Sequence, residues 1–456
     1  MSRRLLIRGG TVVSDGASVP ADVLISEGSI VAVGTIDLAA DQVLDADGCL
    51  VIPGAVDAHT HIFGRVRDDG VSALCGGTTT ALAFTDAEPG ESPAAAARRL
   101  IKEQISGSPI DIAMHGVIWD PDSYREGDLR DLSDLGVTSV KLWLAYPELG
   151  IMADDAQAYR VIVEAAREGV LVQGHCENGG IIEALIDELR QQSRLGLREL
   201  PVARPIISES EAVHRLLAMA ELAGADAYVV HLTCRRALEE IEHARQRGQT
   251  VGAEVCAHHL VLDDGVYGTP EAIRYVMAPP LRPKPESDAL WGALAQGRID
   301  VYASDHSHEP MHPDKAQAGD DLTAVPYGVP GIELRLALGF TFGVGRGRLS
   351  PERLVEVACG APARAFGLFP RKGTVRPGAD ADLVVWDPAV RWTAGPDSRH
   401  DGLDYSPYDG LELEGGARMV VAGGELVVQE REFLGREQPG RFLPRPRRGA
   451  RVLQIA

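Results

Sequence analysis

Two histidines at the end of one short apolar segment have the residue type and spacing of metal ligands. Pro53-Gly54 breaks the chain, and the strand-like residues that follow end in His59 and His61. Alternate side chains of a β-strand share a face, so these imidazoles would lie about 7 Å apart on one rigid edge and could bind one divalent metal ion. Because the chain has 13 histidines, such a pair could also arise by chance, and the interpretation depends on the rest of the sequence.

Four other strand-like segments carry a residue of the metal-binding kind. In a barrel of parallel strands, functional residues lie at the carboxyl ends of the strands. A single strand-end histidine is more often a hydrogen-bonded residue of the core or rim, and a single aspartate more often caps a helix. Their coincidence favours one common site, and the residues are Lys141 within 139–143, His175 after 171–174, His231 after 228–230 and Asp305 after 300–304.

Lys141 is the least expected of these residues, since it interrupts an apolar strand. An unpaired ammonium group costs free energy when it is buried. Such a lysine should therefore be paired with an acid, deprotonated or chemically modified. All three alternatives are compatible with the pattern.

The segments that position these residues alternate between strands and helices from residue 55 to 372. This alternation predicts an α/β fold, a closed (β/α)8 TIM-like barrel. A doubly wound open sheet is the competing fold, but no Gly-x-Gly-x-x-Gly motif opens a helix. Further parallel strands are expected at 78–84, 111–118, 251–257 and 275–278, with helices such as 154–168 and 208–222 between strands.

The two ends of the chain have the pattern of a second, all-β unit. Residues 1–54 and 373–434 contain short apolar segments separated by turn residues, and neither part alone is large enough for a good core. Together they are predicted to form one small β-sandwich, with the barrel inserted between its halves. Residues 435–456 are rich in Arg, Pro and Gly, which predicts either a disordered tail or an arm on a neighbouring subunit.

Charge and cysteine usage narrow the partners and the compartment. The net charge of −21 argues against nucleic acid or an anionic membrane as a partner. No apolar run approaches the roughly 18 residues of a membrane span. The six cysteines are scattered without a Cys-x-x-Cys pair and lie mostly in apolar runs, which indicates buried thiols in a reducing cytoplasm.

An ordered set of motifs accompanies the candidate ligands along nearly the whole chain. With these motifs the sequence resembles the cyclic amidohydrolases of the binuclear-metal amidohydrolase superfamily, and in particular the hydantoinase/dihydropyrimidinase branch. The motifs are GAVDAHTH (54–61), ALCGGTT (73–79), VKLWLAY (140–146), HCEN (175–178), VHL (230–232), APPLR (278–282), SDH (304–306), RKGTV (371–375) and GADADLVVWDP (378–388).

The resemblance implies two divalent metal ions in each subunit. Zinc is expected, with manganese or cobalt as alternatives. Lys141 is expected to be carbamylated by CO2, so that the costly cation becomes an anionic ligand that bridges the two ions. By the same resemblance His59, His61 and Asp305 complete the shell of one ion, and His175 and His231 that of the other.

This metal pair implies a hydrolytic reaction. Two ions about 3.5–4 Å apart would supply a bridging hydroxide near neutral pH. The hydroxide is expected to attack the carbonyl of a cyclic amide or imide, while Asp305 takes its proton and returns it to the leaving nitrogen. Tyr146 completes the Lys-x-x-x-Ala-Tyr pattern of hydantoinases and is expected to stabilise the oxyanion. A tyrosine packed on the rim is the alternative.

Departures from the family pattern bear on the substrate. Phe63 stands where the dihydroorotase branch has an arginine for a substrate carboxylate, which argues against dihydroorotate. Ala278 replaces the serine usual in hydantoinases, and Tyr327 replaces an asparagine that could hydrogen-bond the substrate ring. The expected substrate-binding residues are Phe63, Trp143, Tyr146, Ala278 and Tyr327. Phe63 and Trp143 could also be plain packing residues.

The leading hypothesis is ring opening of a cyclic amide of the hydantoin or dihydropyrimidine type. An allantoinase or dihydroorotase-like enzyme with another ring is the alternative within the family. A non-catalytic structural relative is the alternative from another class, although all six ligands are present. His258 and His259 are expected to support the site or the fold. The resemblance also implies a homo-oligomer, a tetramer or a dimer.

Overall fold

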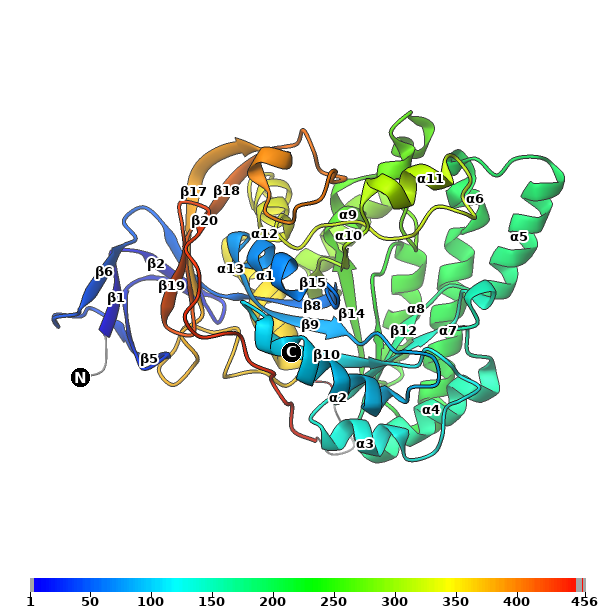
Figure 1. Ribbon diagram of the computed structural model, residues 1–456, viewed down its shortest axis with the longest axis horizontal. Coiled ribbons are helices and arrows are strands. Elements are labelled where there is room, and N and C mark those ends of the chain that lie inside the picture. Colours follow the sequence, from blue (N-terminus) through cyan, green and yellow to red (C-terminus); the bar gives the residue numbers. More distant parts are fainter. Residues whose placement is uncertain (1–3, 448–452, 454–456) are drawn as a thin grey trace.

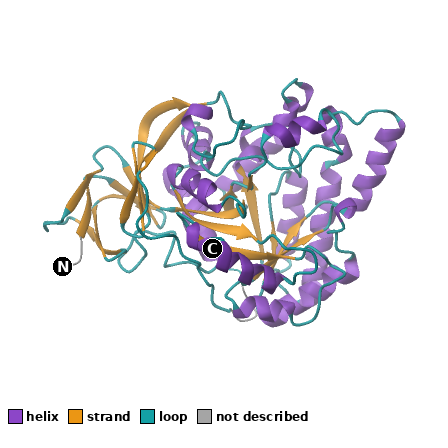
Figure 2. Cartoon of the chain, viewed as in Figure 1, coloured by secondary structure: helices purple, strands orange, loops and turns teal. Residues whose placement is uncertain are grey.

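The computed structural model describes residues 4–447 and residue 453. Their strands form three sheets: two make up an all-β unit, and the third is surrounded by helices (Figures 1 and 2). The helices are α1 (Val66–Cys75), α2 (Pro93–Glu103), α3 (Asp128–Asp134), α4 (Asp155–Glu168), α5 (Gly179–Gln191), α6 (Leu200–Ala203), α7 (Ile206–Ala223), α8 (Arg235–Gln246), α9 (Ala257–Val261), α10 (Lys284–Ala295), α11 (Ala316–Ala318), α12 (Arg335–Leu338), α13 (Pro351–Val355) and α14 (Ala361–Ala365).

The all-β unit combines both ends of the described chain, as the sequence predicts. Strand β7 (Leu50–Pro53) of the N-terminal part pairs antiparallel with strand β17 (Leu383–Thr393) of the C-terminal part, with Leu50 opposite Trp386. The two halves therefore share one sheet. Apolar side chains of both sheets, such as Val23 from one sheet and Val385 from the other, form a common core. One sheet has the order β5 (Ser29–Gly34), β4 (Asp22–Ser26), β1 (Arg4–Arg8), β6 (Gln42–Asp45), and the other β20 (Glu432–Phe433), β19 (Glu425–Gln429), β18 (Glu412–Ala422), β17 (Leu383–Thr393), β7 (Leu50–Pro53), β2 (Thr11–Ser14), β3 (Ala17–Pro20).

The third sheet is parallel throughout and closes on itself. Its last strand, β15 (Val301–Ala303), continues after Ser304 and Asp305 into β16 (His306–Ser307), which pairs with the first strand, β8. This closure gives the predicted TIM-like barrel. The strands before β15 are β8 (Ala55–His61), β9 (Thr78–Phe84), β10 (Asp111–Val117), β11 (Ser139–Trp143), β12 (Leu171–His175), β13 (Ala227–Val229) and β14 (Val251–Cys256).

Two predictions of local structure are wrong. Residues 275–278 are not a strand: a 3-10 turn ends at Tyr275, and residues 276–278 form a loop. The apolar run there lies within a buried cluster, which its hydrophobicity alone does not distinguish from a strand. Helix α7 begins at Ile206 rather than at Ser208, and the Ser208 hydroxyl donates to the Pro205 carbonyl inside the first turn instead of capping the helix.

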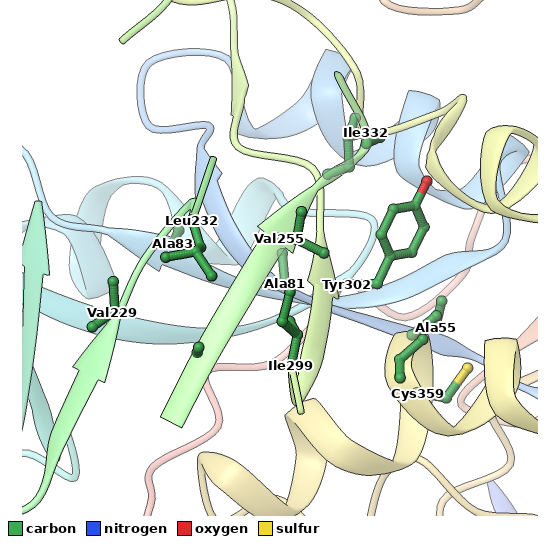
Figure 3. Close-up of a cluster of buried hydrophobic side chains, with 14 of the residues drawn as sticks. Ala55, Ala81, Ala83, Val229, Leu232, Val255, Ile299, Tyr302, Ile332 and Cys359 are labelled. Carbon is green, nitrogen blue, oxygen red and sulfur yellow. The ribbon is translucent and has the colours of Figure 1, made fainter. Parts of the chain in front are cut away.

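The barrel strands have two different faces. Outward residues such as Ala83 and Val255 pack in a large apolar cluster, part of which Figure 3 shows together with Val229, Tyr302 and Ile332. Inward residues such as Phe84 form a second cluster inside the barrel. Because side chains alternate along a strand, the polar residues between outward apolar ones are directed into the barrel.

The tail follows this chain's own barrel. Phe442 bridges to Ile112, Leu443 N donates to Ile112 O, and Arg445 donates to the Met114 carbonyl, so the described residues 435–447 run from the all-β unit beneath the barrel toward α3 (Figure 1). Leu443 and Leu453 are buried within the cluster inside the barrel. Their burial contributes about 1.5–3 kcal/mol each. These residues therefore differ from the disordered tail that composition predicts.

Candidate metal centre

Four predicted ligands from three strands meet at the carboxyl end of the barrel. His59 Nε2 lies 3.2 Å from Lys141 Nζ and 3.0 Å from Asp305 Oδ1, and His61 Nε2 lies 3.6 Å from Asp305 Oδ1. The ligand atoms of His59, His61 and Asp305 are all within 4.8 Å of one another. This spacing suits a common cation.

The remaining two ligands lie beside this group. His175 Nδ1 is 2.9 Å from His231 Nε2, and the His231 ring centroid is 5.4 Å from that of His59. All six residues therefore converge, and all except His59 line one cavity of about 490 Å³.

Backbone strain is concentrated at the ligand-bearing strand ends. His231 has φ of 39° and Asp305 has φ of 49°, both in the left-handed region that costs a non-glycine residue free energy. The strain at Asp305 accompanies the turn between β15 and β16, where the barrel closes. Tyr146, with φ of 66°, is strained in the same way just after β11. Such strain persists where the surrounding structure holds a functional geometry.

Two buried glutamates orient the histidines. Glu254 holds His59 Nδ1 and accepts from the His231 backbone N–H at 3.3 Å. Glu177 Oε2 lies 2.9 Å from His175 Nε2 and also pairs with Arg204. With the proton on the nitrogen that faces Glu254 or Glu177, the other nitrogen of His59 or His175 directs its lone pair to the centre. This is the arrangement that metal-ligating histidines adopt.

Sequence reasoning missed both glutamates and Arg204. Glu254 interrupts an apolar strand just as Lys141 does, and that signal could have identified it. Glu177 is part of the HCEN motif. Arg204 had no such signal, because it lies in the short connection between α6 and α7 and reaches the site only through the tertiary fold.

Lys141 has the environment of a modified residue. Its side chain is 1% exposed, and its Nζ lies 4.3 Å from the Phe84 ring centroid and 4.4 Å from that of Trp143. Burial lowers the pKa of its amine to about 8, although Asp305 and Glu254 act in the opposite direction. Among the described residues no carboxylate comes within 4 Å of Nζ, so the pairing alternative is not realised.

The protonation states suit metal binding. Burial lowers the pKa of His175 to about 4 and holds the pKa of His61 and His231 well below the usual value, so these imidazoles are neutral and offer lone pairs. His175 Nδ1 and His231 Nε2 are close enough for a hydrogen bond when one of them carries a proton, and a cation bound between the rings would take the place of that proton. Four imidazoles, one carboxylate and one modifiable amine therefore fit two divalent ions.

Comparison with known proteins agrees with this donor set. The model of the amidohydrolase family matches residues 50–427. The chain belongs to the amidohydrolase family. It is 35% identical over 452 residues to a D-hydantoinase of Ralstonia pickettii, covering 97% of this chain and 98% of the relative. A family of metal-dependent hydrolases implies a binuclear divalent metal centre.

Solved structures extend the likeness to the fold. A D-hydantoinase structure superposes with a TM-score of 0.94 at 35% identity, covering 99% of this chain and 100% of the other. A dihydropyrimidinase from Brevibacillus agri NCHU1002 gives a TM-score of 0.93 at 34% identity, covering 97% and 99%. Within the described part of this amidohydrolase, no helix is both long and apolar enough to cross a membrane.

Four of the five predicted substrate-binding residues line the cavity of this amidohydrolase: Trp143, Tyr146, Ala278 and Tyr327. Phe63 does not. It lies half-buried against the large core cluster, because the chain turns away from the barrel after His61 and buries Ile62 in that cluster as well. Phe63 thus makes the packing contacts of the alternative interpretation.

Arg204 connects the metal ligands to the cavity wall. Its guanidinium is 2% exposed and lies 4.8 Å from the ring centroids of both Tyr146 and Tyr327. Its partner Glu177 orients His175. The Tyr327 hydroxyl donates to the Leu322 carbonyl at 3.1 Å. Arg204 thus holds both phenol rings in place, and Tyr327 contributes its ring rather than its hydroxyl to the wall.

Proposed function

We propose that this amidohydrolase opens cyclic amide rings of the hydantoin or dihydropyrimidine type by metal-dependent hydrolysis. The observation that carries the proposal is the convergence of six ligand-type residues, four of them buried, at one cavity. The chain is similar over its full length to D-hydantoinases and a dihydropyrimidinase.

Two divalent ions, with zinc expected and manganese or cobalt as alternatives, would be held by these residues. His59, His61 and Asp305 would bind one ion, His175 and His231 the other, and a carbamate on Lys141 would bridge them. Carbamylation is supported by the unpaired, buried amine of Lys141. When bound, the ions supply a hydroxide nucleophile at neutral pH.

The chain's own groups would then handle the proton and the oxyanion. Asp305 would take a proton from the attacking water and return it to the leaving ring nitrogen, as general base and then general acid. Burial raises the pKa of the Tyr146 hydroxyl well above its usual value, so the hydroxyl stays protonated and can donate to the oxyanion.

Tyr146→Phe tests the role of this hydroxyl. The change removes a single hydroxyl group from the cavity wall and should lower kcat by about 10²–10³-fold, as loss of one oxyanion donor does. KM and the metal content should stay near those of the wild type. Full activity in Tyr146→Phe, in a protein that Lys141→Ala inactivates, would disprove the oxyanion role.

The substrate is tested with a panel of purified rings. Ring opening of 5-substituted hydantoins and dihydrouracil, with little turnover of allantoin or dihydroorotate, is the expected result. Preference for allantoin or dihydroorotate would favour the alternative enzymes of the family. A protein that contains no metal when purified, takes up none when metal is added and opens no ring would be a non-catalytic relative.

We also propose the division of the chain and its setting. Residues 1–54 and 373–434 would form the β-sandwich, 55–372 the catalytic barrel and 435–456 the tail. The six cysteines are buried free thiols, which supports a reducing cytoplasm. The family resemblance supports a homotetramer or homodimer, and the strongly acidic chain supports a small-molecule substrate rather than nucleic acid or a membrane as partner.

A further inference from the structure

One histidine in the cavity wall has no partner for either ring nitrogen. His258 lies in the short helix α9 directly after β14 and lines the same cavity as the candidate ligands. It is 1% exposed, and both Nδ1 and Nε2 are buried without a hydrogen-bond partner among the described residues. A buried polar group is ordinarily hydrogen-bonded, so this side chain lacks a partner that a ligand can supply.

The neighbouring histidine shows what a structural role requires. His259 Nε2 donates to the Pro279 carbonyl at 3.0 Å, and the two rings meet edge to face with centroids 4.2 Å apart. His259 therefore anchors the helix and supports the ring of His258. No hydrogen bond in the described structure holds the side chain of His258, although the sequence suggests a supporting role for both histidines.

A cation shared by Cys256, His258 and His259 is the competing explanation, since their ligand atoms lie within 4.8 Å of one another. Such a site needs the thiolate of Cys256. Burial, with help from Asp305 and Glu254, raises the pKa of that thiol well above its usual value, and the thiol therefore keeps its proton. A bound cation would have to displace this proton, so the metal content of His258 variants distinguishes the two explanations.

The other polar side chains of the wall are largely engaged. The Tyr327 hydroxyl donates to Leu322 O, and Trp119 Nε1 donates to Thr85 O at 2.7 Å. Ala278 has no polar group. Trp143 Nε1 is also buried without a partner, but an indole can only donate. Burial lowers the pKa of His258 to about 4, so its neutral ring offers one donor and one acceptor.

We propose that His258 is a substrate-binding residue that accepts a hydrogen bond from the second ring N–H of a cyclic ureide, away from the bond that is cleaved. The inference rests on the proposed function. The reacting carbonyl would face the ligand group and Tyr146. Among the described residues no hydrogen bond or ring contact joins the His258 side chain to those groups, although the charges of Asp305 and His59 act on it. Hydantoin and dihydrouracil both present a second N–H beyond the scissile amide, and a neutral imidazole has one unprotonated nitrogen that can accept from it.

Two variants and two ring compounds test this inference. His258→Phe keeps an aromatic ring without hydrogen-bonding groups, and His258→Asn keeps a donor and an acceptor in a smaller side chain. Succinimide has CH2 where hydantoin has its second N–H. Its Ki is measured as an inhibitor of hydantoin hydrolysis, so the measurement does not require that succinimide itself is hydrolysed. Metal content serves as the control for an intact centre.

We expect His258→Phe to lower kcat/KM for hydantoin by about 30-fold or more, mainly through KM, because a site built for a hydrogen-bonding substrate loses its partner. His258→Asn should recover most of that loss, and the Ki of succinimide should change less than 5-fold. Two ions per chain should remain in both variants.

Unchanged kcat/KM in His258→Phe would overturn the inference, as would equal loss for hydantoin and succinimide without recovery in His258→Asn. Loss of an extra equivalent of metal in either variant would overturn it in favour of the Cys256 site. If the wild-type enzyme opens no ring, the proposed function fails together with this inference. If the wild type opens the rings but the variants behave as in the contradicting cases above, only the role of His258 fails.

Discussion

Two buried lysines at opposite ends of the barrel differ in almost every electrostatic respect. Lys141 at the cavity is 1% exposed and has no carboxylate within 4 Å among the described residues. Lys372, at the junction of the barrel with the all-β unit, is 3% exposed and lies 2.7 Å from Asp111 and 3.0 Å from Asp380. It also pairs with Asp382.

The pKa values follow the partners rather than the burial. Burial alone lowers the pKa of both amines. The pKa of Lys141 falls to about 8, whereas the surrounding carboxylates raise the pKa of Lys372 above its usual value. The difference indicates that Lys372 is a structural cation, and that Lys141 is an amine available for chemical modification.

The largest effect should come from Lys141→Met. Loss of the bridging ligand should lower kcat/KM by roughly 10⁴-fold or more, as loss of an essential catalytic group does. The free energy of unfolding of the metal-free protein should not fall, since an apolar replacement for an unpaired buried amine is neutral or stabilising. Ring-opening rates and urea unfolding of the same preparation measure both. A large loss of stability would assign Lys141 the structural role instead.

Lys372→Met should show the opposite pattern. It leaves Asp382 buried without its cation, while Asp111 keeps Arg441, and the loss should cost about 3–5 kcal/mol of stability. Activity per folded molecule should change little, because the junction is remote from the cavity lining. Urea unfolding and kcat/KM at low temperature give the two values. Equal stability of variant and wild type would remove the contrast between the lysines.

Glu254→Gln should have an intermediate effect on the metal centre. The neutral amide holds His59 and His231 less firmly, and loss of such support lowers metal affinity by about 10–100-fold. Titration with a zinc-binding dye measures the affinity. A matched control is Glu209→Gln, whose carboxylate is equally buried but contacts Thr233 and Arg282 away from the ligands. An equal loss of affinity in the control would contradict the support role.

The smallest effect concerns pH. Burial would raise the pKa of Asp380, but Lys372 and the neighbouring arginines hold it below the usual value. The same balance holds for Asp111. A carboxyl whose folded pKa is lowered contributes stability above its unfolded pKa of about 4, and this is lost as the pH falls further. The difference in free energy of unfolding between wild type and Lys372→Met should therefore be largest at neutral pH and should shrink below pH 4. A difference that does not change with pH would contradict the role of Lys372 as a structural cation.

Much of the site could be predicted because its signals are local. Each ligand follows or interrupts an apolar strand, and the rule for parallel barrels brings strand ends together. Lys141 was recognisable because a charge within a buried strand is costly. Glu254 carried the same signal.

The remaining features depend on tertiary packing. The direction in which Phe63 turns after β8 is set by the core it joins, and the apolar residues 275–278 have no period that separates a strand from a buried loop. The tail residues near Phe442 gain their order only from the barrel surface they cover. Arg204 reaches the cavity through contacts between elements that are distant in sequence.

The most direct test of the central claim is the zinc content of wild type and Lys141→Met after reconstitution with zinc and bicarbonate, measured by mass spectrometry of the metal. Two ions per wild-type chain and at most one per variant chain are expected, since only the wild type has the lysine proposed to bridge them. Two ions in both proteins, or none in the wild type, would contradict the assignment of Lys141 as the modified bridge.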